Sequence, residues 1–372
     1  MLRKALILPG AGARGAYQVG VLKAISSVLP NKAPNPFAVI SGTSAGAINA
    51  AVIASRASRF SLAVKEMERV WENFTADQVY RSDGWTMLQS SLQFFFATLG
   101  LQKPRALLDN TPLEKLLARD IKFANIQRAI DRGHLEALTV TASAYSSAQS
   151  VSFFQGRQGL KPWVRARRCG RPTVIGLSHL MASAAVPFIF PAVKIGAEYY
   201  GDGAMRQSAP LSSAIHLGAD RVLVIGVGDE YPDPEKTGCV PPEIPSFAHL
   251  AGYMLDTLFM DGLYADLERL ERINRILEKI SHDNSKGEDS ELRSVDTLII
   301  SPKRDIRSIA ERHLHELPRA IRLLLRGVGA MNRSGMQLTS YLLFESGFTT
   351  ELINMGFRDA MDVRTDIKDF FS

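Results

Sequence analysis

The chain has 372 residues, of which 46% are hydrophobic and 22% charged, with a formal net charge of +6 at pH 7. These values are typical of a globular protein with a sizeable core, and they argue against a disordered chain. No apolar run approaches the ~20 residues that a membrane-spanning helix needs.

Charge and cysteine content limit the partners and the cellular compartment that we expect. Residues 1–65 hold eight Lys or Arg and no acidic residue, but these bases are scattered singly and no nucleic-acid motif accompanies them, so we expect no nucleic-acid partner. The apolar segment after the basic start is too short for a signal peptide. Cys169 and Cys239 provide no disulfide framework. We therefore expect a cytoplasmic protein that can also bind peripherally to a membrane.

Apolar runs and helical spacing alternate along the chain. The residues from Ala16 to Leu29 are spaced as in an amphipathic helix that Pro30 ends, and the small residues of 42–54 predict a buried helix. Further helical patterns run over 67–74 and from Met254 through Leu263. The arginine-rich segment 163–171 favours a solvated loop. The predicted strands are 4–9, 37–40, 137–142, 151–154, 193–200, 222–227 and 297–300.

This alternation predicts a mostly parallel sheet covered by helices on both faces. The stretches 231–245 and 281–295 have the composition of exposed connections. A strand follows both of them, so we expect residues 231–372 to form an extension packed on the same core as a catalytic region at 1–230, and not a separate unit.

The sequence Gly42-Thr43-Ser44-Ala45-Gly46 is a G-x-S-x-G motif between a predicted strand and a predicted helix. In such a turn the small neighbours let a serine hydroxyl stand exposed while the following amide stays free to donate. The positive end of the helix would also favour negative charge that develops on a substrate. Ser44 is therefore the candidate nucleophile.

A glycine-rich loop, Gly10-Ala11-Gly12-Ala13-Arg14-Gly15, follows the first predicted strand. As a G-x-G-x-x-G pattern it could bind a dinucleotide, but that use expects an acidic residue about twenty positions later, and the first acid is Glu66. The alternative use is an oxyanion hole made of backbone amides at a helix start. The missing acid favours the oxyanion hole.

Gly201-Asp202-Gly203-Ala204 follows another predicted strand. Asp-Gly pairs also occur at Asp83 and Asp261, and most such pairs are plain turns. Only Asp202 follows a strand with glycine on both sides, which allows close approach to another element.

Taken in order, these three blocks resemble the patatin-like phospholipases. Residues 182–191 resemble the segment that precedes the Asp motif in that family, and 340–344 is similar to a stretch of bacterial members. Ala11 stands where many members carry a further glycine. The resemblance implies a three-layer α/β/α fold with additional C-terminal helices, and a Ser-Asp dyad without histidine or cofactor. By it, Ser44 is the nucleophile and Asp202 the base. Gly10, Ala11, Gly12, Arg14 and Gly15 belong to the oxyanion hole, Gly42, Thr43, Ala45 and Gly46 to the nucleophile turn, and Gly203 and Ala204 to the base motif.

The expected substrate is a phospholipid or another lipid ester, so the expected function is a lipid acyl hydrolase of the phospholipase A type. Alternatives are a triacylglycerol lipase, a thioesterase, or a non-catalytic dinucleotide-binding or membrane adaptor protein. A Ser-Asp-His triad would use His282, His313 or His315, although each is more typical of a surface or packing position. No cysteine or histidine cluster has metal-ligand spacing. The uncharged stretch 85–101 is either a core helix or a flap that meets lipid chains.

Overall fold

A computed structural model describes residues 2–81, 106–228, 246–282, 293–332 and 335–372. Its strands join in one sheet with the order β10-β9-β1-β2-β3-β4-β6-β5, and a hairpin of β7 and β8 attaches to β3. The strands are β1 (Lys4–Leu8), β2 (Val39–Thr43), β3 (Ala137–Ala144), β4 (Ser150–Gly156), β5 (Trp163–Arg165), β6 (Arg168–Pro172), β7 (Val193–Ile195), β8 (Glu198–Asp202), β9 (Arg221–Ile225) and β10 (Asp296–Ile300).

The centre of the sheet is parallel. Strand β1 lies between β9 and β2, with Leu8 opposite Gly42, and β2 continues to β3. Almost every side chain of these strands is buried, as expected where helices cover both faces. Because parallel strands end at the same edge, the segments that follow β1 and β2 meet there.

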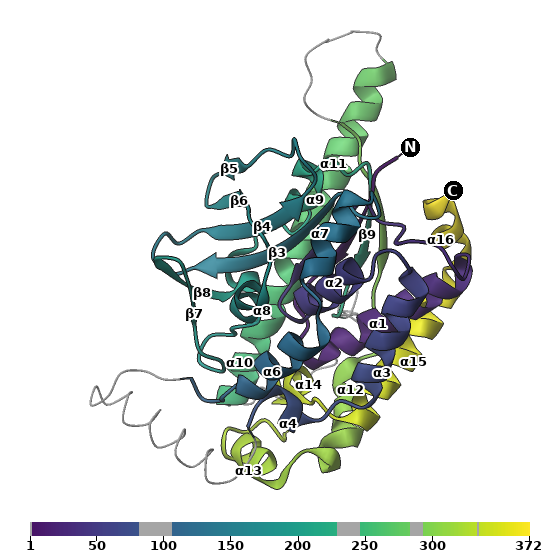
Figure 1. The fold of residues 1–372 in the computed structure, drawn as a ribbon. Coiled ribbons are helices and arrows are strands. Elements are labelled where there is room, and N and C mark those ends of the chain that lie inside the picture. Colours follow the sequence, from purple (N-terminus) through teal and green to yellow (C-terminus); the bar gives the residue numbers. More distant parts are fainter. Residues whose placement is uncertain (1, 82–105, 229–245, 283–292, 333–334) are drawn as a thin grey trace.

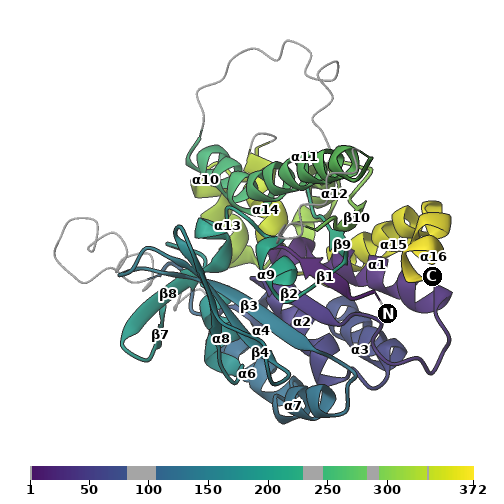
Figure 2. The same cartoon turned by 90° about the horizontal axis from the view of Figure 1, so that it is seen from above.

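Helices cover both faces of the sheet, with α2, α3 and α7 on one side and α9 and α11 on the other (Figure 2). The structure therefore confirms the three-layer α/β/α fold with a mostly parallel sheet. The helices are α1 (Gly15–Val28), α2 (Ala45–Ser55), α3 (Phe60–Glu72), α4 (Ala76–Val79), α6 (Thr111–Asp120), α7 (Ala124–Asp131), α8 (Leu177–Ser183), α9 (Ser212–His216), α10 (Phe247–Asp256), α11 (Gly262–His282), α12 (Ile306–His313), α13 (Arg319–Gly327), α14 (Met336–Leu342), α15 (Ser346–Asp362) and α16 (Arg364–Phe371). Short 3-10 helices η1 (Gly12–Arg14), η2 (Gly203–Arg206) and η4 (Leu314–Glu316) lie between some of these elements, and a π-helical segment η3 (Thr257–Asp261) joins α10 to α11.

Two predicted elements are wrong in the outer part of the sheet. Residues 193–200 form the hairpin of β7 and β8 and not one strand, because Gly196 adopts a φ of +62° and reverses the chain. The arginine-rich segment 163–171 is not a loop. It forms the antiparallel pair β5 and β6, which turns at Arg167 with a φ of +61°. Near the centre, β2 runs through Thr43, so α2 begins three residues later than the predicted helix.

The described residues from 246 onward contact the same core (Figure 1). Strand β10 pairs with β9, and α15 lies along α1. The two helices come so close that a Cβ at Gly20 would overlap the Ile353 carbonyl and one at Gly356 the Tyr17 carbonyl. None of the described helices is long and apolar enough to span a bilayer. The predicted flap at 85–101, the connection at 231–245, Asp83 and Cys239 lie outside the described residues.

Candidate active site

Ser44 lies in a sharp turn between β2 and α2. Its backbone has a φ of 54° and a ψ of −129°, a conformation that costs a non-glycine residue about 1–3 kcal/mol. The turn also needs small neighbours, because a Cβ at Gly42 would overlap the backbone of Ala47 and one at Gly46 the carbonyls of Leu8 and Pro9. The close packing holds the serine in this strained conformation, at the carboxyl end of the sheet and the start of a helix.

Ser183, at the end of α8, connects the nucleophile turn to the neighbouring strand. The backbone N–H of Ser44 donates to Ser183 Oγ at 2.9 Å, and the Ser183 hydroxyl donates to the Thr141 carbonyl at 2.6 Å. The side chain is fully buried. Ser183 lies in the family-like segment 182–191, and the sequence of that segment gives no sign of its role. Its contact with the Ser44 amide identifies it as part of the site.

Asp202 ends β8 beside β3. Its backbone N–H donates to the Ala185 carbonyl at 2.8 Å, so the segment that carries Ser183 also fixes the aspartate. Its Oδ1 accepts a hydrogen bond of 2.9 Å from the Ala204 N–H. A Cβ at Gly203 would overlap the Thr141 carbonyl and lie 2.8 Å from Thr43 Cγ2, so only glycine allows this turn to pack between β2 and β3.

The electrostatic surroundings of Asp202 are unusual for a carboxylate. Burial raises the pKa of Asp202 from 3.8 to about 7, against the opposing effects of the Ser44 hydroxyl and the Ala204 N–H. The Ser44 hydroxyl is thus close enough to interact. Its contact is looser than a standard hydrogen bond, since Asp202 Oδ2 has no such partner among the described residues. Catalytic hydrogen bonds are commonly long before substrate binds.

The predicted oxyanion loop lies between β1 and α1, next to Ser44. Gly12 has a φ of +51°, and a Cβ there would lie 2.5 Å from the Tyr341 carbonyl oxygen. Among the described residues, no acceptor pairs with the backbone N–H groups of Gly10, Ala11 or Gly12, nor with that of Ala45 after the serine. Gly15 begins α1 and packs against Trp71, 3.1 Å from the position of a Cβ. The loop and the serine turn thus offer several unpaired donors at one edge of the sheet.

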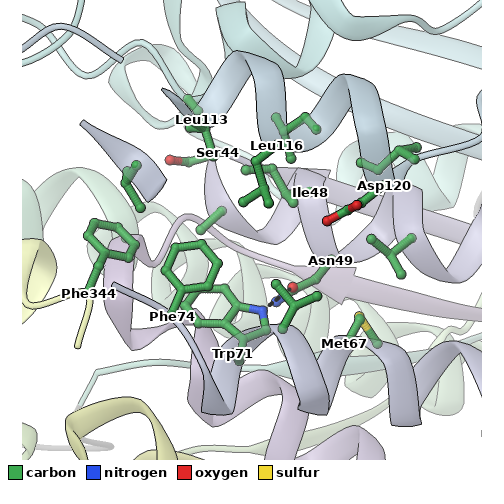
Figure 3. A pocket seen from close by; sticks show the side chains of 18 of the residues that line it. Ser44, Ile48, Asn49, Met67, Trp71, Phe74, Leu113, Leu116, Asp120 and Phe344 are labelled. Atoms are coloured by element: carbon green, nitrogen blue, oxygen red, sulfur yellow. Dashed lines mark hydrogen bonds between the residues drawn. The ribbon is translucent and has the colours of Figure 1, made fainter. Parts of the chain in front are cut away.

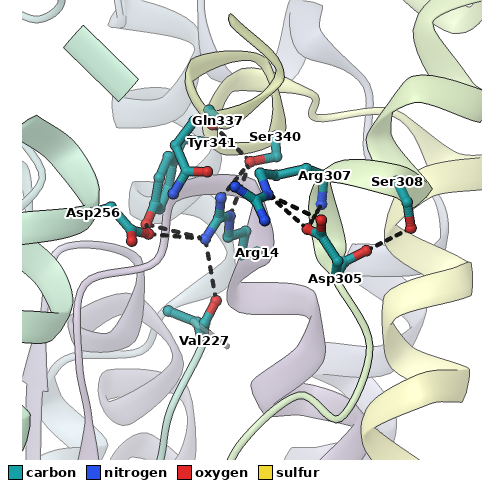
Figure 4. Close-up of polar contacts among 9 residues, drawn as sticks. All are labelled: Arg14, Val227, Asp256, Asp305, Arg307, Ser308, Gln337, Ser340 and Tyr341. Atoms are coloured by element: carbon teal, nitrogen blue, oxygen red, sulfur yellow. Dashed lines mark hydrogen bonds and ion pairs between the residues drawn. The ribbon is translucent and has the colours of Figure 1, made fainter. Parts of the chain in front are cut away.

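The side chain of Arg14 contacts residues of the C-terminal region (Figure 4). Its Nε and Nη2 donate to Ser340 Oγ at 2.9 and 2.7 Å, and its guanidinium lies 3.9 Å from the centre of the Tyr341 ring. Asp256 completes the group, 3.4 Å from Arg14 Nη1 and accepting from the Tyr341 hydroxyl at 2.9 Å. Arg14 therefore anchors the loop, and its charged group is already bonded. Residues far along the chain hold the loop in place.

A cavity with a volume of about 230 Å³ adjoins Ser44 (Figure 3). Its walls are mainly apolar and come from α2, α3, α6, the segment 184–190 and the end of α14. Gly12 and Ala45, from the loop and the turn with unpaired amides, also line it. An apolar substrate bound there would lie beside the hydroxyl of Ser44 and these amides.

No histidine of the described residues lines this cavity. Of the predicted triad candidates, His313 bonds Glu316 and Glu351 in the C-terminal helices, and His315 lies beside it on the surface. The side chain of His282 is outside the described part. Within the described ranges, no cluster of His, Cys, Asp or Glu could hold a metal ion.

Comparisons with known proteins place the chain in a family. A search of curated proteins finds no match. Among solved structures, VipD from Legionella pneumophila aligns over 92% of this chain and 67% of its own, with 12% sequence identity and a TM-score of 0.31, a similarity that carries no argument about function. The model of the family described as Patatin-like phospholipase matches residues 6–215, more than half of the chain. This chain belongs to the patatin-like phospholipase family.

Proposed function

We propose that the chain is a lipid acyl hydrolase of the phospholipase A type, in which Ser44 attacks an ester carbonyl and Asp202 takes its proton. The observation that carries this proposal is the buried Asp202 carboxylate beside Ser44, with its pKa raised to about 7. A carboxylate near its ordinary pKa is a weak base for an alcohol, whereas one that titrates near neutrality accepts a proton far more readily.

The reaction proceeds in two halves. In the first, Ser44 Oγ bonds to the carbonyl carbon, its proton passes to Asp202, and the carbonyl oxygen becomes an oxyanion. The unpaired N–H groups of Gly10, Ala11, Gly12 and Ala45 are the available donors for that oxyanion. Collapse of this adduct breaks the ester bond, and the leaving alcohol takes the proton from Asp202. In the second half, water attacks the acyl-serine and gives a proton to Asp202; as the bond to Ser44 Oγ breaks, Ser44 takes that proton back and the fatty acid leaves.

The C-terminal extension, residues 231–372, belongs to the same catalytic unit in this proposal. Ser340 and Tyr341 bond the side chain of Arg14, and β10 extends the central sheet. A lipid ester lies within a bilayer, so the protein acts at a membrane surface, consistent with a cytoplasmic protein that binds membranes peripherally.

The test is Ser44→Ala, compared with Ser55→Ala as a matched control. Ser55 ends α2, the helix that follows Ser44; it is equally buried, bonds the Val52 carbonyl and does not line the cavity. A fluorophosphonate should label the wild type and Ser55→Ala at residue 44, and Ser44→Ala should neither be labelled nor hydrolyse phospholipid. Labelling at another residue, or turnover in Ser44→Ala, would overturn the proposal. A preference for triacylglycerol or acyl thioesters over phospholipid would change the assigned substrate but would not change the proposed mechanism.

A further inference from the structure

The cavity beside Ser44 continues along the whole length of α2. The sequence of that helix places Ile48, Val52 and Arg56 at successive intervals of four residues after Ser44, and all four line the cavity. Residues four apart lie on the same side of a helix. The twelve residues from Ser44 to Arg56 rise by ~18 Å. The cavity is therefore a channel that starts at the nucleophile and runs to the far end of the helix.

The middle of the channel offers a bound chain only apolar contacts. Ile48 and Val52 form one wall, and Met67, Val70 and Leu116 from α3 and α6 face them. The polar groups in this part are already bonded. Asn49 Oδ1 accepts from Trp71 Nε1 at 3.0 Å, and Asn49 Nδ2 donates to the Gly15 carbonyl and to Gln18 Oε1 at 3.2 and 3.0 Å. A hydrocarbon chain could occupy this stretch without leaving a polar group unpaired.

The far end of the channel is charged and open to water. Its rim carries both positive and negative side chains, four of which form the ion pairs Arg56–Glu66 and Arg119–Asp120. Arg69 and Lys122 are exposed beside them. The six charged groups that line this end are Arg56, Glu66, Arg69, Arg119, Asp120 and Lys122. Methylenes that pass this rim leave the apolar walls and return to water, so they add no binding free energy.

We infer that the channel holds a single unbranched acyl chain of membrane length, and that its charged rim sets the upper limit. The inference rests on the proposed function, because it assigns the bound ester to Ser44. The span of ~18 Å is close to the hydrocarbon depth of one leaflet, ~15 Å, which is the length of chain that a membrane lipid supplies. The whole cavity holds about 230 Å³, and part of it lies around Ser44 beside residues 184–190 and 341–344, so the stretch along α2 is too narrow for two chains side by side. The substrate class is a long, saturated or nearly straight acyl ester.

The experiment measures the rate at which alkyl fluorophosphonates, from ethyl to octadecyl, label Ser44 below their aggregation limit. For the wild type, the second-order rate constant should rise roughly three- to fourfold for each added methylene, and it should level off near tetradecyl, whose extended length is about 18 Å. Val52 lies two thirds of the way along the channel. Val52→Trp should move the plateau to chains near octyl and slow octadecyl labelling at least tenfold, without changing the rate for ethyl.

Leu116→Trp, on the opposite wall, should shift the plateau in the same direction. If Val52→Trp does not fold, the result for Leu116→Trp tests the inference in its place. Leu62→Trp is the control, since Leu62 is on α3 but exposed and outside the channel. A rate independent of chain length, or an unchanged plateau in a folded channel variant, would overturn the inference while labelling at Ser44 still supports the hydrolase. If no probe labels Ser44, the proposed hydrolase activity is wrong and this inference is wrong with it.

Discussion

Asp202→Asn should make the protein inactive and, above neutral pH, more stable. The substitution keeps the shape of the side chain and the acceptor for the Ala204 N–H, but it removes the charge and the proton acceptor. Burial raises the pKa of Asp202 from 3.8 to about 7, which corresponds to a free-energy cost of ~4 kcal/mol for the ionised form. In the proposed mechanism, activity needs the ionised form of Asp202, which is the form that folding disfavours.

The sign of the pH dependence follows from linkage. An aspartate with a raised pKa in the folded state binds more protons there than in the unfolded chain, so the contribution of Asp202 to wild-type stability is most favourable below pH 3.8 and declines as the pH rises to about 7. Asparagine does not titrate. The stability of Asp202→Asn relative to the wild type should therefore increase by roughly 2–3 kcal/mol between about pH 5 and pH 9.

The assays are urea unfolding and hydrolysis of a short soluble ester, both across this pH range. Wild-type kcat/KM should rise with pH and level off above an apparent pKa of about 7, and Asp202→Asn should lose at least ~10²-fold in activity at the plateau. Two controls isolate Asp202. Burial also raises the pKa of Glu345 to about 7, and Glu345→Gln should keep the pH profile. Asp266→Asn removes a buried carboxylate outside the cavity and should keep the activity.

Two results would refute this reasoning. One is an Asp202→Asn variant that retains most of its activity, because the carboxylate would then not be the base. The other is a stability difference between variant and wild type that does not change with pH, because Asp202 would then have an ordinary pKa in the folded protein. The first result would point to a histidine as base, and replacing each of the seven histidines in turn would identify it.

Three further substitutions test the construction of the site. Ser183→Ala removes the acceptor for the Ser44 N–H, and kcat should fall roughly tenfold with KM unchanged, as steady-state kinetics would show; an unchanged kcat would deny Ser183 a positioning role. Gly203→Ala should abolish activity because its Cβ would overlap the Thr141 carbonyl, whereas Gly176→Ala, with no atom within 4 Å, should match the wild type in activity and melting temperature. Ser340→Ala should lower the unfolding free energy by about 1–3 kcal/mol, since it leaves the buried Arg14 side chain without its closest acceptor. A melting temperature equal to that of the wild type would contradict this.

The central sheet could be predicted because its strands are nearly continuous apolar runs. The segments 4–9 and 222–227 correspond to β1 and β9, and no other element type suits such short buried runs between helical patterns. The hairpin at 193–202 could not be found in this way. Its reversal depends on Gly196 at positive φ, and an isolated glycine in an apolar segment also occurs within strands.

The family was predicted from three short motifs, and the match over residues 6–215 confirms it. The roles of Ser44 and Asp202 stay predictions. Contacts between distant residues were beyond the sequence, because a single sequence carries no sign of spatial pairing. Arg14 and Ser340 are 326 positions apart, and Ser183 and Ser44 are 139 apart. Serine is too common for its position alone to suggest a bond to the amide of a nucleophile.

The features of the site that lower the stability of the folded protein are concentrated in a few residues. Ser44 has a strained backbone, and Asp202 has a buried oxygen without a hydrogen-bond partner among the described residues and a raised pKa. Such features persist only where many surrounding contacts hold them in place. Here Ser183 bonds the amide of Ser44, Gly203 packs against Thr141, and the fully buried strands β2 and β3 lie beneath both residues. Since relaxing either residue would require moving these packed strands, the stability of the central sheet maintains the strained turn of Ser44 and the burial of Asp202.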